Sequence, residues 1–257
     1  MEFSKEHGLN EILDALNEMF EFHPILKMCV NDEYEVPYLV GNSKPQIVVE
    51  SEVSNEFILE YLTQSFDLHE SLCKFLIIEN DDSFDLYGVF HHIICDARSC
   101  AIFKDNLQAI LNGQILEVDD SFLKVSAFSQ QIQESEQFAK ANDFYDNMLV
   151  DCNEVGVLLD SVGANGPGSA QTCLDLDSRR FLKNLDISEN VLFTSVFSYT
   201  LSQFVNGNKV IFTMIENGRD RFKENFIGMT SNVMPVVIGC KDQSISSYVE
   251  DVSDKVY

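Results

Sequence analysis

The sequence predicts a two-lobed α/β protein with mixed sheets and flanking helices. Apolar residues recur at helical spacing in several segments, and short apolar runs bounded by Pro, Gly and Asn, typical of strands, lie between them. The elements do not alternate as strict βαβ units, which favours mixed sheets. One Gly-, Pro- and Ser-rich stretch, residues 161–169, indicates a crossover. We therefore expect a first lobe over 1–162, a crossover linker over 163–170 and a second lobe over 171–257.

Helical periodicity is clearest near the start of the chain. Apolar residues from Leu9 to Phe20 follow the i, i+3, i+4, i+7 spacing of an amphipathic helix. A second stripe runs from Phe103 to Leu111 and stops at Asn112-Gly113, a typical helix end. Further helices are expected at about 55–64, 126–149, 189–205 and 245–256.

The expected strands are short apolar runs between turn-forming residues. The runs Lys74–Ile78 and Phe84–Phe90 flank the turn Asn80–Ser83, which predicts a hairpin. The remaining expected strands are Ile25–Val30, Tyr34–Val40, Ile47–Val49, Thr172–Leu176, Val210–Ile215 and Val233–Ile238.

The charge balance excludes two classes of partner. The chain has 17 Lys+Arg against 42 Asp+Glu, a formal net charge of −25, so a nucleic acid or an anionic membrane surface would be repelled. No apolar run is long enough to span a membrane, and the first residues do not resemble a signal peptide. The seven cysteines form no Cys-x-x-Cys motif. We expect a cytoplasmic protein with buried thiols.

Two adjacent histidines stand out, because His91 and His92 follow an expected strand and precede an expected helix. Such turns often carry active sites, and a neutral imidazole is the usual general base near neutral pH. Other readings stay open: Asp96 could be only a helix N-cap, and the histidines could be solvent-facing residues without a role. Neighbouring strand residues point to opposite faces, so we discard a shared metal site and expect no metal.

The segment His91-His92-x-x-x-Asp96 resembles the active-site motif of condensation domains of nonribosomal peptide synthetases, which have the chloramphenicol acetyltransferase-like fold. The resemblance extends to other segments in family order. These are His23-Pro24-Ile25-Leu26-Lys27, Phe66-Asp67-Leu68, Asn217-Gly218-Arg219-Asp220 and Ile227-Gly228-Met229-Thr230-Ser231-Asn232.

The sequence also departs from the family pattern. Ala97 replaces the glycine after the motif aspartate, Lys27 replaces an arginine, and Thr230-Ser231 replaces a bulkier pair. The family's opening motif, first strand and last two motifs have no counterpart. We therefore expect a domain fragment with an incomplete second lobe, which should be marginally stable and self-associating on its own because strand edges and apolar surface stay uncovered.

The resemblance implies amide-bond formation, in which a carrier-protein-bound aminoacyl amine attacks a carrier-protein-bound donor thioester. His92 would be the catalytic residue, His91 would support the loop, and Asp96 would form a structural ion pair with Lys27. Arg219 and Asn232 could line a cleft in the second lobe, or could simply satisfy backbone groups.

The implied partners are donor and acceptor peptidyl carrier proteins, with adjacent adenylation and carrier domains of a larger synthetase. The carrier proteins would bring 4'-phosphopantetheine, and no cofactor would bind directly. Two alternatives remain: an epimerisation domain or related acyltransferase on the same fold, and a catalytically inactive remnant that only binds carrier proteins.

Overall fold

The computed structural model describes residues 1–33, 38–41, 43–150, 183, 187–204, 209–219, 222, 225–240 and 243–256. The chain divides into two compact units. Unit 1 is Met1–Ile132 with Asn217–Ser231, and unit 2 is Gln133–Glu216 with Asn232–Tyr257. The expected linker 163–170 and the expected strand 172–176 lie outside the described residues, so the boundary near 162 stays a prediction. The segment 217–231, which we expected in the second lobe, belongs to unit 1.

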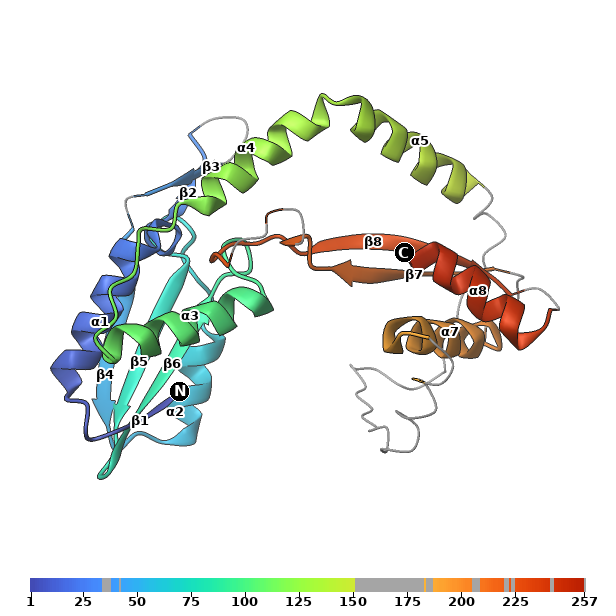
Figure 1. The fold of residues 1–257 in the computed structure, drawn as a ribbon. Helices are drawn as coiled ribbons and strands as arrows, with labels where there is room; N and C mark the ends of the chain where they lie inside the picture. The colour runs from blue at the N-terminus through green and yellow to red at the C-terminus, as the bar shows by residue number, and fades with distance from the viewer. Residues whose placement is uncertain are drawn as a thin grey trace. The chain divides into compact units, whose positions relative to one another are not determined.

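Unit 1 is built on a four-stranded mixed sheet with the order β1-β6-β5-β4 (Figure 1). β4 (Gln46–Ser51) is parallel to β5 (Cys73–Glu79), and β5 is antiparallel to β6 (Ser83–Phe90). The hairpin formed by β5 and β6 is the one that the sequence predicts. Its end, at Phe90, leads directly into the histidine pair.

The first strand corrects one expectation. β1 (Glu2–Ser4) lies before the first helix, where we expected no strand, and it pairs antiparallel with residues Ser83–Asp85 of β6. The strand escaped prediction because Phe3 is its only apolar residue, and one residue makes no alternation. Phe3 itself is buried in the core of unit 1.

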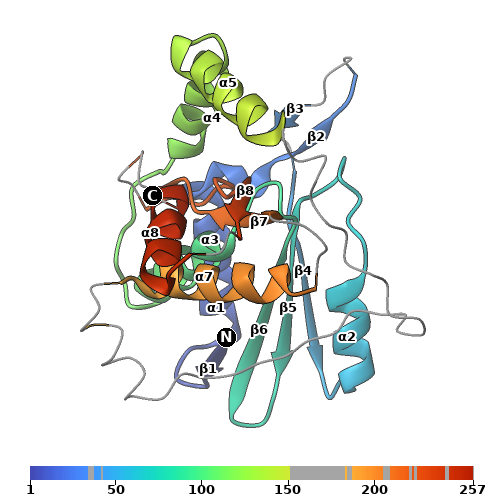
Figure 2. The ribbon, with the colours of Figure 1, turned by 90° about the vertical axis from the view of Figure 1, so that its right-hand side faces the viewer.

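Helices cover both faces of this sheet (Figure 2). α1 (Leu9–Phe22) and α3 (Ala97–Leu111) pack on the face to which Phe75 and Ile77 of β5 point. α2 (Asn55–Thr63) packs through Tyr61 on the opposite face, to which the intervening residues of β5 point. β5 is therefore buried on both faces, which explains its nearly continuous apolar sequence.

Two short strands precede β4. Pro24–Lys27 forms a 3-10 turn, and β2 (Cys29–Asn31) then pairs antiparallel with β3 (Tyr38–Val40). The strand that we expected over Ile25–Val30 is thus correct only in its last part. Pro24 explains the difference, because its fixed φ and missing N–H suit the first position of a helical turn.

The long helix expected over 126–149 is two helices. α4 (Ser121–Gln133) and α5 (Glu136–Val150) are separated at Glu134-Ser135. The Ser135 Oγ accepts a hydrogen bond of 3.1 Å from the Phe138 N–H, as an N-cap residue does. The single helix that we expected is therefore interrupted by a serine that caps a new helix start.

Unit 2 contains the two-stranded antiparallel sheet of β7 (Lys209–Glu216) and β8 (Asn232–Gly239). α7 (Glu189–Ser202) and α8 (Ile245–Val256) pack together with this sheet around Val210, Ile238 and Val252. α7 turns small polar residues inward, and its Ser198 hydroxyl lies 2.8 Å from the Tyr248 hydroxyl. None of the helices in the described part of the chain is long and apolar enough to cross a membrane.

Candidate active site

The histidine pair lies in a tight turn between β6 and α3. The His91 N–H donates to the Leu72 carbonyl at 2.8 Å, and the Ile94 N–H donates to the His91 carbonyl at 3.1 Å. These two bonds connect the turn to the residue before β5 and close the turn on itself. The backbone of the motif is therefore held by the sheet on one side and by the start of α3 on the other.

The His91 side chain is engaged within the turn. Its Nδ1 accepts a hydrogen bond of 3.2 Å from the Ile93 N–H. Its ring meets the Phe66 ring edge to face, with 5.9 Å between the centroids. A ring nitrogen that accepts from the backbone cannot at the same time take up a substrate proton, so His91 has the contacts of a residue that supports the loop.

The His92 side chain, in contrast, is exposed. No residue in the described ranges forms a hydrogen bond or ion pair with its ring. Both ring nitrogens are therefore available to a bound molecule. Of the three motif residues His91, His92 and Asp96, only His92 combines exposure with an unoccupied side chain.

Asp96 is the N-cap of α3. Its Oδ1 accepts hydrogen bonds from the Ser99 N–H at 2.8 Å and from the Ser99 hydroxyl at 2.9 Å. The residue is buried, with 3% of its surface exposed. The simpler reading of Asp96, as a helix cap, is thus correct, although capping is only part of what the carboxylate does.

The carboxylate also forms a buried ion pair with Arg219. The Arg219 Nη2 lies 2.8 Å from Asp96 Oδ1, and the two side chains are 7% and 2% exposed. The guanidinium donates further hydrogen bonds to the carbonyls of Phe226 at 2.7 Å and Gly228 at 2.9 Å. Its carbon lies 4.6 Å from the centroid of the Phe226 ring. Arg219 therefore connects the segment 217–231 to the start of α3.

Ser99 and Thr230 complete this group, which we call the Asp96 cluster: Asp96, Ser99, Arg219, Gly228 and Thr230. The Ser99 Oγ accepts from the Gly228 N–H at 3.0 Å and from Arg219 Nη2 at 2.8 Å. The Thr230 hydroxyl lies 3.2 Å from Asp96 Oδ2. Gly228 leaves little room, because a Cβ there would lie 3.0 Å from the Phe226 ring.

The cluster determines the charge state of Asp96. Burial by itself would raise the pKa of this carboxyl, but the hydrogen bonds from Arg219 and Ser99 outweigh it and hold the pKa below the ordinary value. Asp96 is therefore a carboxylate near neutral pH, and its negative charge is matched by Arg219. A carboxylate that is fully engaged in this way holds structure and has no free oxygen to act as a base.

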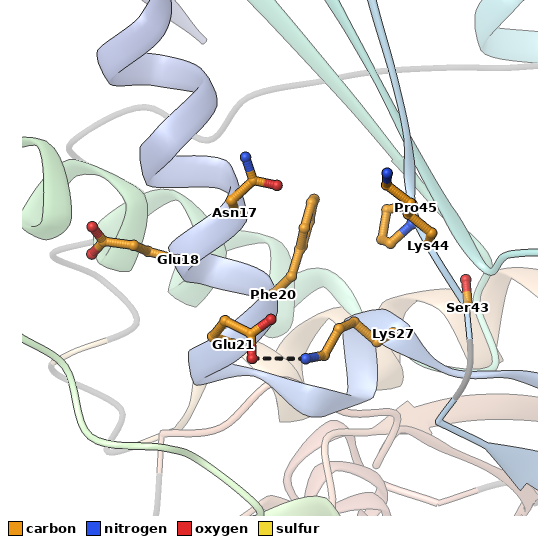
Figure 3. A pocket seen from close by; sticks show the side chains of 8 residues that line it. All are labelled: Asn17, Glu18, Phe20, Glu21, Lys27, Ser43, Lys44 and Pro45. Carbon is orange, nitrogen blue, oxygen red and sulfur yellow. Dashed lines mark ion pairs between the residues drawn. The ribbon is translucent and has the colours of Figure 1, made fainter.

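The expected ion pair between Asp96 and Lys27 is wrong. Lys27 Nζ lies 3.0 Å from Glu21 Oε2, at the surface, with side chains 32% and 74% exposed. Figure 3 shows this pair at the rim of a pocket of about 320 Å³. The pocket is lined by Asn17, Glu18, Phe20, Glu21, Lys27, Ser43, Lys44 and Pro45. Lys27 thus takes no part in the Asp96 cluster.

The two residues expected in a second-lobe cleft belong to different units. Arg219 is buried within unit 1, in the Asp96 cluster, and its guanidinium does not face a cleft there. Asn232 is the first residue of β8 in unit 2, and it is exposed. The role expected for Asn232 stays a prediction.

Ser99 and the function of Thr230 were not predicted from the sequence. A signal for Ser99 was present, because Asp96 and Ser99 have the spacing of an N-cap and the third helical residue. Thr230 was noted only as a departure from the family pattern. Its role depends on a contact across 134 positions, which no local pattern reports.

A buried lysine lies behind the His91 ring. Lys74 Nζ donates to the Gln64 carbonyl at 2.9 Å and lies over the rings of Tyr61 and Phe66, at 4.8 and 5.3 Å from their centroids. Burial lowers the pKa of Lys74. Since Phe66 also contacts His91, the lysine, the phenyl ring and the histidine form one packed series.

Among the described residues, no three His, Cys, Asp or Glu side chains gather as a metal site.

A family model for the condensation domain matches residues 1–257. The chain belongs to the condensation domain family. Acyl transfer that forms an amide bond is the activity that this family implies in general. No curated protein matches the sequence.

Solved structures agree with this assignment at the level of the fold. The epimerization domain from the third module of tyrocidine synthetase B is 17% identical, with a TM-score of 0.75, and covers 99% of this chain. The SgcC5 protein from Streptomyces globisporus is 15% identical, with a TM-score of 0.76 and 99% coverage. The condensation domain from the Monacolin K polyketide synthase MokA is 12% identical, with a TM-score of 0.78 and 100% coverage.

The chain spans 66%, 64% and 65% of these three chains, respectively. The similarity to these structures shows that the mixed α/β fold is of the chloramphenicol acetyltransferase type, as the resemblance implied.

Proposed function

We propose that this condensation domain forms an amide bond by attack of a carrier-bound aminoacyl amine on a carrier-bound donor thioester, with His92 as the catalytic residue. The observation that carries the proposal is the state of the three motif side chains. His91 and Asp96 are engaged in supporting contacts, whereas His92 is exposed and unoccupied among the described residues. The partners would be donor and acceptor peptidyl carrier proteins, within a larger synthetase that includes adenylation domains.

The chemistry requires a group at the position of His92. The acceptor amine attacks only as the free base, and it becomes positively charged as its bond to the donor carbonyl forms. An imidazole nitrogen within hydrogen-bonding distance can accept that proton, and the proton then leaves with the thiolate when the C–S bond breaks. The 4'-phosphopantetheine arms of the carrier proteins would supply both thioesters, so the chain itself needs no bound cofactor.

The Asp96 cluster supports this role by holding the turn in one conformation. A catalytic group contributes most when its position is set before the substrate arrives. The turn is bound to Leu72 through the backbone of His91, and α3 is bound to the segment 217–231 through Asp96 and Arg219. His92 therefore extends from a backbone that is anchored at both ends.

The test is a condensation assay with the full natural protein and two loaded carrier proteins. We expect His92→Ala to lower the rate of dipeptide formation by about a hundredfold or more, the range for a positioned acid–base group. The exposed His69 lies outside the motif, so His69→Ala is the matched control and should keep the wild-type rate. Circular dichroism should be unchanged in both variants, because neither side chain is buried.

The outcomes separate the alternatives. Wild-type turnover by His92→Ala would contradict the assignment of His92. If the wild-type protein instead inverted the configuration of a carrier-bound residue without joining two residues, epimerisation would be the function. Binding of carrier proteins without either reaction would indicate an inactive remnant.

A further inference from the structure

Two cysteines meet at the start of α3. Asp96 is the N-cap, so Cys95 directly precedes the cap and Cys100 is the fourth helical residue. Side chains at these two positions commonly pack on one another at helix starts, where apolar residues form a hydrophobic staple. Here the two residues are thiols, and their Sγ atoms lie 3.5 Å apart. The contact thus follows from the helix start itself.

The two thiols differ in access to solvent. Cys95 is 5% exposed and lies between the buried residues Ile94 and Asp96. Cys100 is exposed, and both cysteines are free thiols. Burial, with the neighbouring Cys100 thiol, raises the pKa of Cys95, so its thiol stays protonated near neutral pH. Because Cys100 is exposed and Cys95 is buried, a dissolved oxidant reaches the Cys100 sulfur first.

We propose that Cys95 and Cys100 are an oxidation site, at which a peroxide converts the thiol pair into a disulfide. Hydrogen peroxide oxidises the Cys100 thiol to a sulfenic acid and is itself reduced to water. The Cys95 sulfur then attacks the Cys100 sulfur, the S–O bond breaks, and the Cys95 proton leaves with the oxygen as a second water. Two thiols and one peroxide thus give one disulfide and two waters.

The geometry requires only a small movement. A disulfide has an S–S length of about 2.05 Å, so the sulfurs must approach by roughly 1.5 Å from their present 3.5 Å. The exposed Cys100 side chain can make this movement, whereas Cys95 is held by its buried neighbours. The closed ring contains Asp96 and Ser99, so the bond forms within the part of the chain that anchors the motif turn.

The position of Arg98 makes the bond easy to detect. Trypsin cleaves after Lys74, Arg98 and Lys104, so Cys95 is in peptide 75–98 and Cys100 is in peptide 99–104. The full chain is treated with a small excess of hydrogen peroxide, blocked with N-ethylmaleimide before unfolding, and digested. We expect peptides 75–98 and 99–104 to appear as one linked species, and to separate when dithiothreitol is added.

Variants and an internal control keep the test specific. Cys100→Ser and Cys95→Ala should each abolish the linked species, and Cys95→Ala should leave Cys100 as a sulfenic or sulfinic acid. Peptide 28–74 contains the buried Cys29 and Cys73 and should stay unlinked at the same dose. The proposal is overturned if wild-type Cys100 is recovered as a thiol, as a sulfinic acid, or linked to a cysteine other than Cys95.

Discussion

Replacing Asp96 with Ala should strongly destabilise unit 1. The change removes the partner of a guanidinium that is 7% exposed, and it also removes the cap of α3. Leaving one member of a buried ion pair uncompensated costs about 3–5 kcal/mol. Arg219 keeps two carbonyl acceptors, at Phe226 and Gly228, which favours the lower end of that range. With about 1 kcal/mol for the lost cap, we expect a decrease of about 4 kcal/mol in the free energy of unfolding.

The comparison with the Lys27 pair makes this expectation specific. Glu21→Ala breaks an exposed ion pair and should cost no more than about 1 kcal/mol. In the double variant Asp96→Ala/Arg219→Met the buried cation is gone, so the loss should be smaller than the sum of the two single losses. The chain has no tryptophan, so unfolding in urea is followed by far-ultraviolet circular dichroism. The rate at which a thiol reagent labels the buried Cys95 is a second measure of unfolding, and it reports on unit 1.

A loss of stability in Asp96→Ala no larger than that in Glu21→Ala would show that the buried ion pair is not stabilising. Losses that simply add in the double variant would show that the carboxylate and the guanidinium do not interact. A crystal structure with Asp96 next to Lys27 would restore the pairing that the resemblance implied.

Three further predictions concern neighbouring groups. Because the pKa of Asp96 is lowered when the chain folds, its stabilising effect is complete above the ordinary value of 3.8 and is lost as the pH falls toward the folded pKa. Urea midpoints measured from about pH 6 to about pH 3 should therefore decrease less steeply in Asp96→Asn. Gly228→Ala brings a Cβ within 3.0 Å of the Phe226 ring and should lower stability by about 1–3 kcal/mol, whereas Gly41→Ala, with open space around it, should not. Lys74→Met removes a buried cation but keeps most of the packing, so a loss above about 3 kcal/mol in thermal unfolding would contradict our account of that lysine.

The sequence alone determined the elements whose patterns are local. The apolar stripe of α1 and the β5–β6 hairpin each depend on residues a few positions apart, and the structure has both. The N-cap at Asp96, which the sequence left open as an alternative, is local in the same way and is also present. The histidine pair could be located between strand and helix for the same reason. The resemblance added the family, which the family model confirmed over the whole chain.

Only the tertiary structure decided which side chains meet. Lys27 and Arg219 are both cations in family-like motifs, and nothing local to either one says which of them reaches Asp96. The choice of Arg219, 123 positions away, depends on how the segment 217–231 packs on α3, with Gly228 small enough to allow the approach. β1 could not be predicted for a similar reason. Its three residues include one apolar side chain, and they form a strand because they pair with β6. Short-range periodicity is encoded in adjacent residues, whereas these long-range contacts exist only once the chain has folded.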